Sequence, residues 1–472
     1  MGDTTPAAVF CQRPEGWKNN ESLKERHLPR KERKAMALHV MEEANRCLGC
    51  KVPRCQQGCP IHTNIPEVIR LLKAGKLNDA GWMLFENNPL TTVCSLVCNH
   101  EAQCEGHCVR GIKDVPVHFS VIENYISTTY ANQMVQGPAK SNGRKAAVIG
   151  AGPAGITIAI ILARYGYKVT IYDSRDKVGG VLRYGIPDFR LPDTVLDDIA
   201  YRHLELKGIE FRPNTYIGSA ITIDDLFRDG YQSVFVGSGL WRPRKLNIRG
   251  ESLGHVTYAI NYLASPKAFR LGDRILIIGT GNSAMDCART AVRNGARHVT
   301  CVNRTDVITA SQYESSYAKL EGVEFLMNKC TMEIREDGVI LADSKVDENG
   351  KVSPIEGTEK LYPCTGVIIA VSQGAESNLV TSTKGIDTER TGLLTVDEDG
   401  RTSRPGVFAA GDAVNGARTV VEAVNNGKRV AEAMHEYMQS LPMPVTTDYP
   451  DAPVVETIDA AAQAEQIIAP AK

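Results

Sequence analysis

Eight of the 13 cysteines in this 472-residue chain lie between residues 47 and 108, in two groups of four. The first group has the spacing C-x2-C-x4-C-x3-C-P, and the second has C-x3-C-x5-C-x3-C. Thiolates this close together in a sequence can face one metal centre from a single loop. The two groups comprise Cys47, Cys50, Cys55, Cys59, Cys94, Cys98, Cys104 and Cys108.

Two kinds of metal centre fit these groups: structural zinc held by four thiolates, and iron–sulfur clusters. The Cys59-Pro60 pair resembles the end of a bacterial ferredoxin motif, in which the last cysteine binds the other cluster. Zinc cannot carry electrons, and two nucleotide-binding patterns follow in the chain, so iron–sulfur clusters are favoured. We expect His62, His100 and His107 to be surface or capping residues, because none has ligand spacing within the groups.

Composition excludes several classes of protein. The net charge of −1 gives no electrostatic footprint for nucleic acid. No run approaches 18 apolar residues, so we expect no membrane span, and the N-terminus lacks the apolar core of a secretory signal. We therefore expect a cytoplasmic, reducing location, where clustered cysteines bind metal rather than form disulfides.

Changes in pattern divide the chain into segments. Helical periodicity leads into Cys47, and further helices are predicted from Asn64 to Gly75 and over residues 77–86. These helices indicate a small domain whose loops carry the cysteines and whose clusters stabilise a thin core. The predicted segments are an N-terminal arm (1–35), the helical domain (36–140), a nucleotide domain in two parts (141–268 and 373–440), a second nucleotide domain (269–372) and a C-terminal tail (441–472).

Short apolar runs alternate with helical segments after a linker over residues 136–145. This alternation predicts an α/β fold with parallel sheets. The predicted strands are AAVIG, KVTIYD, SVFVGSG, RILIIG, HVTCVNR, GVIIAVS and GVFAAGD.

The first glycine-rich loop joins two of these strands through a helix. Gly150, Gly152 and Gly155 form G-x-G-x-x-G, and Asp173 ends the second strand. The glycines allow a tight turn and close approach of a pyrophosphate, and the acid is placed to bind ribose hydroxyls. This context predicts a dinucleotide site.

A second loop repeats the layout, with alanine at the third position. No acid closes its second strand; Arg304 stands there instead, which favours the 2′-phosphate of NADP(H), whereas the nearby Asp306 keeps NAD(H) as an alternative. The predicted nucleotide-binding residues are Gly279, Gly281, Asn282, Ser283, Ala284 and Arg304.

A third element suits a flavin. Gly411 and Asp412 follow an apolar strand and precede a helix that begins near Thr419. An aspartate there can bind a ribityl hydroxyl, and the helix N-terminus can stabilise negative charge on a reduced flavin. The segment VGGVLRYGIPDFRLP, which contains Gly180 and Arg190, is expected to lie against the same cofactor.

The order of these motifs resembles the small (beta) subunit of bacterial glutamate synthase. It is equally similar to the large subunit of NADH-dependent ferredoxin:NADP oxidoreductase, a bifurcating transhydrogenase, and to the amino-terminal part of dihydropyrimidine dehydrogenase. The resemblance covers residues ~36–440. It implies a helical domain with two [4Fe-4S] clusters on a glutathione-reductase-like pair of FAD- and NAD(P)-binding domains.

The resemblance also implies an interleaved set of cluster ligands. Cys47, Cys50, Cys55 and Cys108 would hold one cluster. Cys59, Cys98 and Cys104 would hold the other, with either Cys94 or Glu123 as its fourth ligand.

The implied function is that of an NAD(P)H-dependent flavin and iron–sulfur oxidoreductase subunit. Electrons would pass between NADP(H) and the clusters to a partner flavin or iron–sulfur subunit, with ferredoxin as a further partner. A ferredoxin-linked, bifurcating transhydrogenase complex is the favoured setting, and glutamate synthase is the alternative. A non-redox zinc protein is the alternative of another class.

Overall fold

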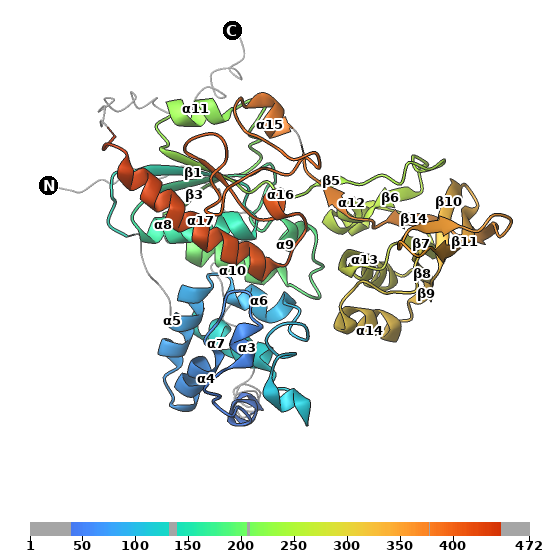
Figure 1. Cartoon of the computed structure of the whole chain (residues 1–472), viewed down its shortest axis with the longest axis horizontal. Helices are drawn as coiled ribbons and strands as arrows, with labels where there is room; N and C mark the ends of the chain where they lie inside the picture. The colour runs from blue at the N-terminus through green and yellow to red at the C-terminus, as the bar shows by residue number, and fades with distance from the viewer. Residues whose placement is uncertain (1–38, 132–138, 205–207, 377, 445–472) are drawn as a thin grey trace, which may run out of the picture.

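The computed structural model describes residues 39–131, 139–204, 208–376 and 378–444. They form a helical domain and two sheet-containing domains (Figure 1). The helical domain packs below the first nucleotide domain in this view, and the second nucleotide domain lies to one side. The predicted N-terminal arm and most of the predicted C-terminal tail lie outside the described residues.

The helical domain is built around an aliphatic core. A helix over residues 39–45 precedes the first cysteines, and Val68, Leu84, Ile122 and Ile126 are almost completely buried. The helices that follow are α3 (Arg54–Gln57), α4 (Ile65–Lys73), α5 (Leu77–Asn87), α6 (Thr91–Val97), the 3-10 turn η1 (Val109–Ile112) and α7 (Phe119–Ala131).

The predicted helices of this domain are confirmed, with two differences. Asn64 stands at the start of α4, but its side chain makes no capping hydrogen bond. The expectation that all the cysteines lie in loops is wrong, because Cys55 lies in α3 and Cys94 in α6. Both helices are shorter than two full turns, so they show too little periodicity to be recognised in the sequence.

The first nucleotide domain has a parallel five-stranded sheet in the order β16-β4-β1-β2-β3. Its last strand and last helix follow the second nucleotide domain in the sequence, as predicted. The strands are β1 (Lys145–Ile149), β2 (Lys168–Tyr172), β3 (Glu210–Arg212), β4 (Ser233–Val236) and β16 (Val407–Ala409). The helices are α8 (Pro153–Arg164), α9 (Val181–Tyr184), α10 (Asp193–Ile199), η2 (Ala200–Leu204), α11 (Ile223–Arg228), α15 (Asn378–Ser382), α16 (Asp412–Asn415) and α17 (Val420–Ser440).

The second nucleotide domain repeats this plan with a parallel sheet in the order β6-β14-β7-β8-β9. Its strands are β6 (Val256–Tyr258), β7 (Arg274–Ile278), β8 (His298–Val302), β9 (Glu324–Leu326) and β14 (Gly366–Ile369). Its helices are α12 (Ala259–Ala264), η4 (Pro266–Ala268), α13 (Asn282–Arg293) and α14 (Gln312–Leu320). All seven predicted strands are therefore present, and the α/β fold class is confirmed.

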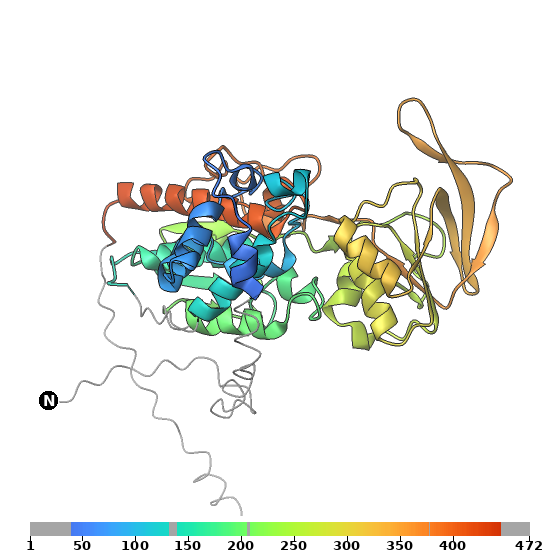
Figure 2. The same ribbon diagram turned by 90° about the horizontal axis from the view of Figure 1, so that it is seen from below.

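An antiparallel sheet that the sequence analysis did not predict projects from the far end of this domain (Figure 2). The alternation of apolar and polar residues in its strands is weak, because side chains on both faces of the sheet are exposed. Its strands are β10 (Lys329–Arg335), β11 (Gly338–Val346), β12 (Val352–Pro354) and β13 (Lys360–Pro363).

The boundary between the nucleotide domains lies earlier than the predicted residue 268. Strand β6 pairs with β14 in the second sheet, so residues 256–258 already belong to the second domain. The crossing is made by a short antiparallel pair, β5 (Arg242–Pro243) with β15 (Gln373–Gly374). Sequence pattern alone missed it because β6 has only three residues and no glycine-rich turn after it.

A clasp of two residues from the first nucleotide domain holds the second. The Arg190 guanidinium contacts both carboxylate oxygens of Asp286 on α13, at 2.9 and 2.8 Å, and Glu314 on α14 at 2.7 Å. Beside it, the Phe189 ring lies between the guanidinium groups of Arg289 and Arg293, at 4.7 and 4.2 Å from the ring centre. The paired charges are buried, so this contact joins the domains where water does not compete.

No helix of the described ranges is long and apolar enough to cross a membrane.

Replacing Arg190 with leucine should destabilise the protein by about 3–5 kcal/mol, because the buried charge of Asp286 would lose this partner and Glu314 would keep only Arg289. Urea unfolding followed by circular dichroism measures the loss. Arg228→Ala is the matched control, since its pair with Asp225 is exposed and should contribute less than about 1 kcal/mol. Equal, small effects of the two changes would contradict a buried clasp.

Candidate functional site

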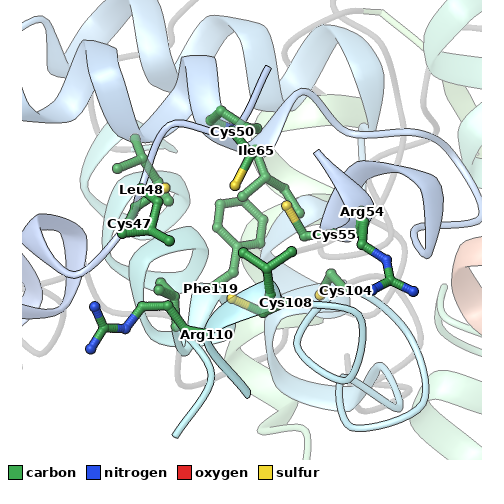
Figure 3. A pocket seen from close by; sticks show the side chains of 14 residues that line it. Cys47, Leu48, Cys50, Arg54, Cys55, Ile65, Cys104, Cys108, Arg110 and Phe119 are labelled. Carbon is green, nitrogen blue, oxygen red and sulfur yellow. The ribbon is translucent and has the colours of Figure 1, made fainter. Parts of the chain in front are cut away.

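The cysteines of the helical domain surround two neighbouring cavities. The first is lined by Cys47, Cys50, Cys55, Cys104 and Cys108. Figure 3 shows these side chains around Ile65 and Phe119, which form the apolar wall of the cavity. Residues from both cysteine groups therefore meet here, although 34 residues lie between the groups in the sequence.

The second cavity lies deeper and is lined by Cys59, Cys94, Cys98, Cys104 and Glu123. The Cys59 thiol is 3.5 Å from the Thr63 hydroxyl. Cys104, Ile65 and Phe119 line both cavities, so the two sites share a wall. All the predicted metal-ligand residues lie in one cavity or the other.

Burial sets the protonation of these groups. It raises the pKa of the Cys55 thiol to about 11 and that of Cys104 well above its usual range. It also raises the pKa of the Glu123 carboxyl to about 7, while the Thr91 hydroxyl donates a 2.7 Å hydrogen bond to Glu123 Oε1 and lowers it in part. A positive metal centre would favour the charged forms of all these groups.

The thiols of both cysteine groups stand around the two cavities. This arrangement suits a multi-atom cluster with thiolate ligands at its corners.

His100 belongs to the second cavity rather than to the surface. Its backbone oxygen caps the following turn, as expected, but its side chain lines the cavity. Its Nε2 atom is buried, and no described residue supplies a hydrogen-bond partner for it. An N–H group at Nε2 in this position can donate a hydrogen bond to a bound sulfide or thiolate. In the sequence, only the proximity of Cys98 points to this role.

A third cavity, of about 280 Å³, brings the predicted cofactor motifs of both nucleotide domains together. The helical domain contributes Val97 and Asn99 to its wall. The Asn99 Oδ1 atom is buried without a partner among the described residues, so it can accept a hydrogen bond from a ligand there. Predicted residues that line this cavity are Gly150, Gly152, Asp173, Gly180, Arg190, Asn282, Ser283, Gly411, Asp412 and Thr419.

The first glycine loop has the geometry that a pyrophosphate needs. Gly150 has φ 100°, and a Cβ there would meet the Gly237 oxygen at 2.3 Å. A Cβ on Gly155 would meet the Gly150 oxygen at 2.0 Å, so this glycine lets α8 pack on the loop. Gly152 has nothing within 4 Å of its Cβ position, which leaves room for a ligand beside the backbone.

Asp173 holds this loop in place. Its Oδ2 atom accepts a hydrogen bond from the Ala151 N–H at 2.6 Å, and its Oδ1 atom accepts one from the Arg175 N–H at 2.8 Å. Burial raises the pKa of this carboxyl. Each oxygen keeps a second lone pair with which a ribose hydroxyl can bond.

The segment from Gly411 to Ala423 closes the same cavity. Burial raises the pKa of Asp412 to about 6, and its Oδ1 atom accepts a 3.2 Å hydrogen bond from the Arg418 N–H. Helix α17 begins after Thr419, as predicted, with a capping box in which the Thr419 N–H donates to Glu422 at 2.9 Å. The start of this long helix therefore faces the cavity.

The second loop is built like the first. Gly279 has φ 126°, and a Cβ there would meet the Ala370 oxygen at 2.4 Å. Gly281 precedes α13, and a Cβ there would make only an ordinary contact, with the Thr309 hydroxyl at 3.7 Å, whereas Ala284 is fully buried against the sheet. Arg304 is exposed just after β8, so its guanidinium can reach a nucleotide at the strand end.

Arg190 lies in the wall of the third cavity, but its guanidinium is already paired with Asp286 and Glu314. Sequence reasoning placed it at the cofactor because the surrounding segment is glycine-rich. Its contacts are long-range, which a local pattern does not reveal. Gly180, in the same segment, does approach the loop: a Cβ there would meet the Gly152 Cα at 2.8 Å.

The three cavities stand in a row. Val97, Asn99 and Val420 line the third cavity, and their chain neighbours Cys98, His100 and Val421 line the second. The second and first cavities share residues, as described above. A continuous path of packed atoms therefore joins the nucleotide loops to the outermost cysteines.

Known proteins share this combination. Residues 144–427 match the family model of pyridine nucleotide-disulphide oxidoreductases, and residues 24–135 match the model of dihydropyrimidine dehydrogenase domain II, 4Fe-4S cluster. FprA from Mycobacterium tuberculosis in complex with NADPH shares the fold, with a TM-score of 0.54 and 17% identity over 63% of this chain and 85% of that one.

Two curated relatives extend over most of the chain. The small chain of glutamate synthase [NADPH] from Azospirillum brasilense is 34% identical over 84% of this chain and 89% of its own length. The NAD-dependent dihydropyrimidine dehydrogenase subunit PreT from Salmonella typhimurium is 32% identical over 85% of this chain and 95% of its own. The chain therefore belongs to the glutamate synthase small-chain family, whose members are NAD(P)H-dependent flavin and iron–sulfur oxidoreductase subunits.

Proposed function

We propose that this chain is the subunit that carries electrons between NADP(H) and a partner oxidoreductase subunit, through FAD and two [4Fe-4S] clusters. The observation that carries the proposal is the row of three cavities from the nucleotide loops to the outer cysteines. Bound there, FAD exchanges electron pairs with a nicotinamide and single electrons with iron–sulfur clusters.

The chain's own residues supply binding, orientation and exclusion of water. The loop at Gly150–Gly155 and the carboxylate of Asp173 suit the pyrophosphate and ribose of FAD, and Asp412 suits its ribityl chain. The loop at Gly279–Ala284 suits the nicotinamide nucleotide. Asn282 and Ser283 line the same cavity as the FAD residues, so the two nucleotides would share one cavity.

The two cysteine cavities support one assignment of the cluster ligands. Cys47, Cys50, Cys55 and Cys108 are the proposed ligands of the outer cluster, and Cys59, Cys98 and Cys104 are three ligands of the inner one. We propose Glu123 as the fourth. The Cys98 thiol is within hydrogen-bond reach of Cys94, which together with burial holds its pKa well above the usual range. Ligands of a four-iron cluster occupy separate corners, so this close pair favours the Glu123 carboxylate, which lines the same cavity.

Two partner settings follow from different observations. The cysteine-region sequence favours a ferredoxin-linked, bifurcating transhydrogenase complex. The identity to glutamate synthase small chains favours a complex that forms glutamate. Assays of the purified complex with ferredoxin and both nicotinamides, and separately with glutamine and 2-oxoglutarate, distinguish them by which acceptor draws electrons.

Anaerobically purified protein should contain FAD and about eight iron atoms per chain, the content of two [4Fe-4S] clusters. NADPH should bleach the flavin absorption and produce the electron paramagnetic resonance signal of reduced clusters. Metal analysis that finds zinc without iron, or a colourless protein, would support a structural zinc protein and overturn the proposal.

Glu123→Ala should lower the iron content and change the electron paramagnetic resonance spectrum of one cluster only, because one corner would lose its protein ligand. Cys94→Ala is the matched control in the same cavity and should keep the full iron content. The opposite pattern, with iron lost from the Cys94 variant and kept in the Glu123 variant, would assign Cys94 as the ligand.

Arg304→Ala should raise the KM for NADPH about tenfold or more and leave the KM for NADH unchanged, because a charge-assisted bond to the 2′-phosphate contributes about 1.5–3 kcal/mol. Arg297→Ala, an exposed arginine before β8, should change neither value. If the KM rises equally for NADPH and for NADH, Arg304 does not select between the two nucleotides.

A further inference from the structure

A network of hydrogen bonds connects helix α17 of the first nucleotide domain with a cysteine of the inner cavity. The Lys428 Nζ donates to the backbone oxygen of Asn87 at 2.7 Å and to its Oδ1 atom at 2.8 Å. The Asn87 Nδ2 group donates to Thr63 Oγ1 at 3.1 Å, and Thr63 Oγ1 lies 3.5 Å from the Cys59 sulfur. Three separate segments, α17, the end of α5 and the loop before α4, therefore join a charged group to one cavity sulfur.

Each group in this network fixes the orientation of the next. A lysine ammonium can only donate, so the Asn87 amide turns its oxygen toward Lys428 and its nitrogen toward Thr63. The Thr63 oxygen accepts from that nitrogen, which leaves the hydroxyl hydrogen free to point at Cys59. A Cys59 sulfur bound to iron has no hydrogen and can only accept. The network is therefore arranged to donate a hydrogen bond to a metal-bound sulfur.

The network is shielded from water near the cavity. Thr63 is 5% exposed and lines the inner cavity beside Cys59. Burial lowers the pKa of Lys428, whereas the negative charges of Glu86 and Cys59 raise it. Glu86 is exposed and has Arg164 as a partner at 3.2 Å. Hydrogen bonds and charges interact more strongly in such surroundings than in water, so the lysine charge can act on the Cys59 sulfur.

We propose that Lys428, Asn87 and Thr63 are positioning residues that raise the reduction potential of the inner cluster through the Cys59 sulfur. This rests on the proposed function, which assigns that cluster to the cavity. A reduced cluster carries one more negative charge than the oxidised one, so a hydrogen bond to its sulfur and a nearby cation stabilise it. The cluster takes up one electron, supplied by NADPH through FAD, and no bond to these residues forms or breaks.

The test is a potentiometric titration of the anaerobically purified full-length chain, with dithionite as reductant and electron paramagnetic resonance as readout. Lys428→Met should lower the electron affinity of one cluster about tenfold, which is about 59 mV for a one-electron couple, and leave the other cluster unchanged. The shift should persist at high salt, because a partly buried charge is screened little. Arg429→Met is the matched control: it removes the same charge from the next, exposed residue of α17 and should shift neither cluster.

Thr63→Val should shift the same cluster in the same direction, whereas Thr63→Ser keeps the hydroxyl and should retain the wild-type potential. Combining Thr63→Val with Lys428→Met should shift the potential no further than the larger single change, because both break one network. The shifted signal should belong to the cluster whose spectrum Glu123→Ala or Cys94→Ala alters, since those residues line the inner cavity.

Iron content separates an effect on the potential from a loss of structure, and each variant should keep the iron content of wild type. If Lys428→Met loses iron, Lys428→Gln keeps a donor for Asn87 without the charge and should still lower the potential. Unchanged potentials in variants that keep their iron, or an equal shift with Arg429→Met, would overturn the proposal. A wild-type protein without reducible clusters would overturn the proposed function as well.

Discussion

The interleaving of the two cysteine groups is the constraint on which the helical domain depends. Each cavity takes side chains from both groups, and Cys104 lies in the wall of both. The shape of each loop therefore depends on the other, although helices α4 and α5 separate them in the chain. Two metal centres held in this way would close several loops at once, which removes more chain entropy from the unfolded state than two separate sites would.

Most of the structure that could be predicted was recognised from local patterns in the sequence. The parallel strands and both glycine loops could be recognised because each depends on residues within about thirty positions. Arg190, Asn99 and His100 could not be placed, because their surroundings come from distant segments: Arg190 meets α13 and α14, and Asn99 joins the helical domain to the nucleotide cavity. The same reason explains the early start of the second nucleotide domain, which only the pairing of β6 with β14 reveals.

The helical domain packs on the first nucleotide domain through a shared apolar core that includes Phe85, Leu90 and Val93, and polar contacts join the second nucleotide domain to both. The clasp at Arg190 joins the two nucleotide domains, and the Tyr313 N–H donates to Glu101 of the helical domain at 3.1 Å. Paired groups of this kind give orientation more than stability, since their attraction is offset by the water they lose. Buried ion pairs such as Arg190 with Asp286 therefore lie where the orientation between domains has to be reproducible.

The position of helix α17 bears on the rate at which electrons could pass between the nucleotide cavity and the inner cysteine cavity. Its first turn places Val420 in the wall of the nucleotide cavity and Val421 in the wall of the inner cysteine cavity, and Lys428 farther along donates to Asn87 of the helical domain at 2.7 and 2.8 Å. Electron tunnelling falls steeply with the separation of donor and acceptor. With FAD and an iron–sulfur cluster bound in these two cavities, this one backbone turn would set their separation, and motion of the second nucleotide domain would leave it unchanged.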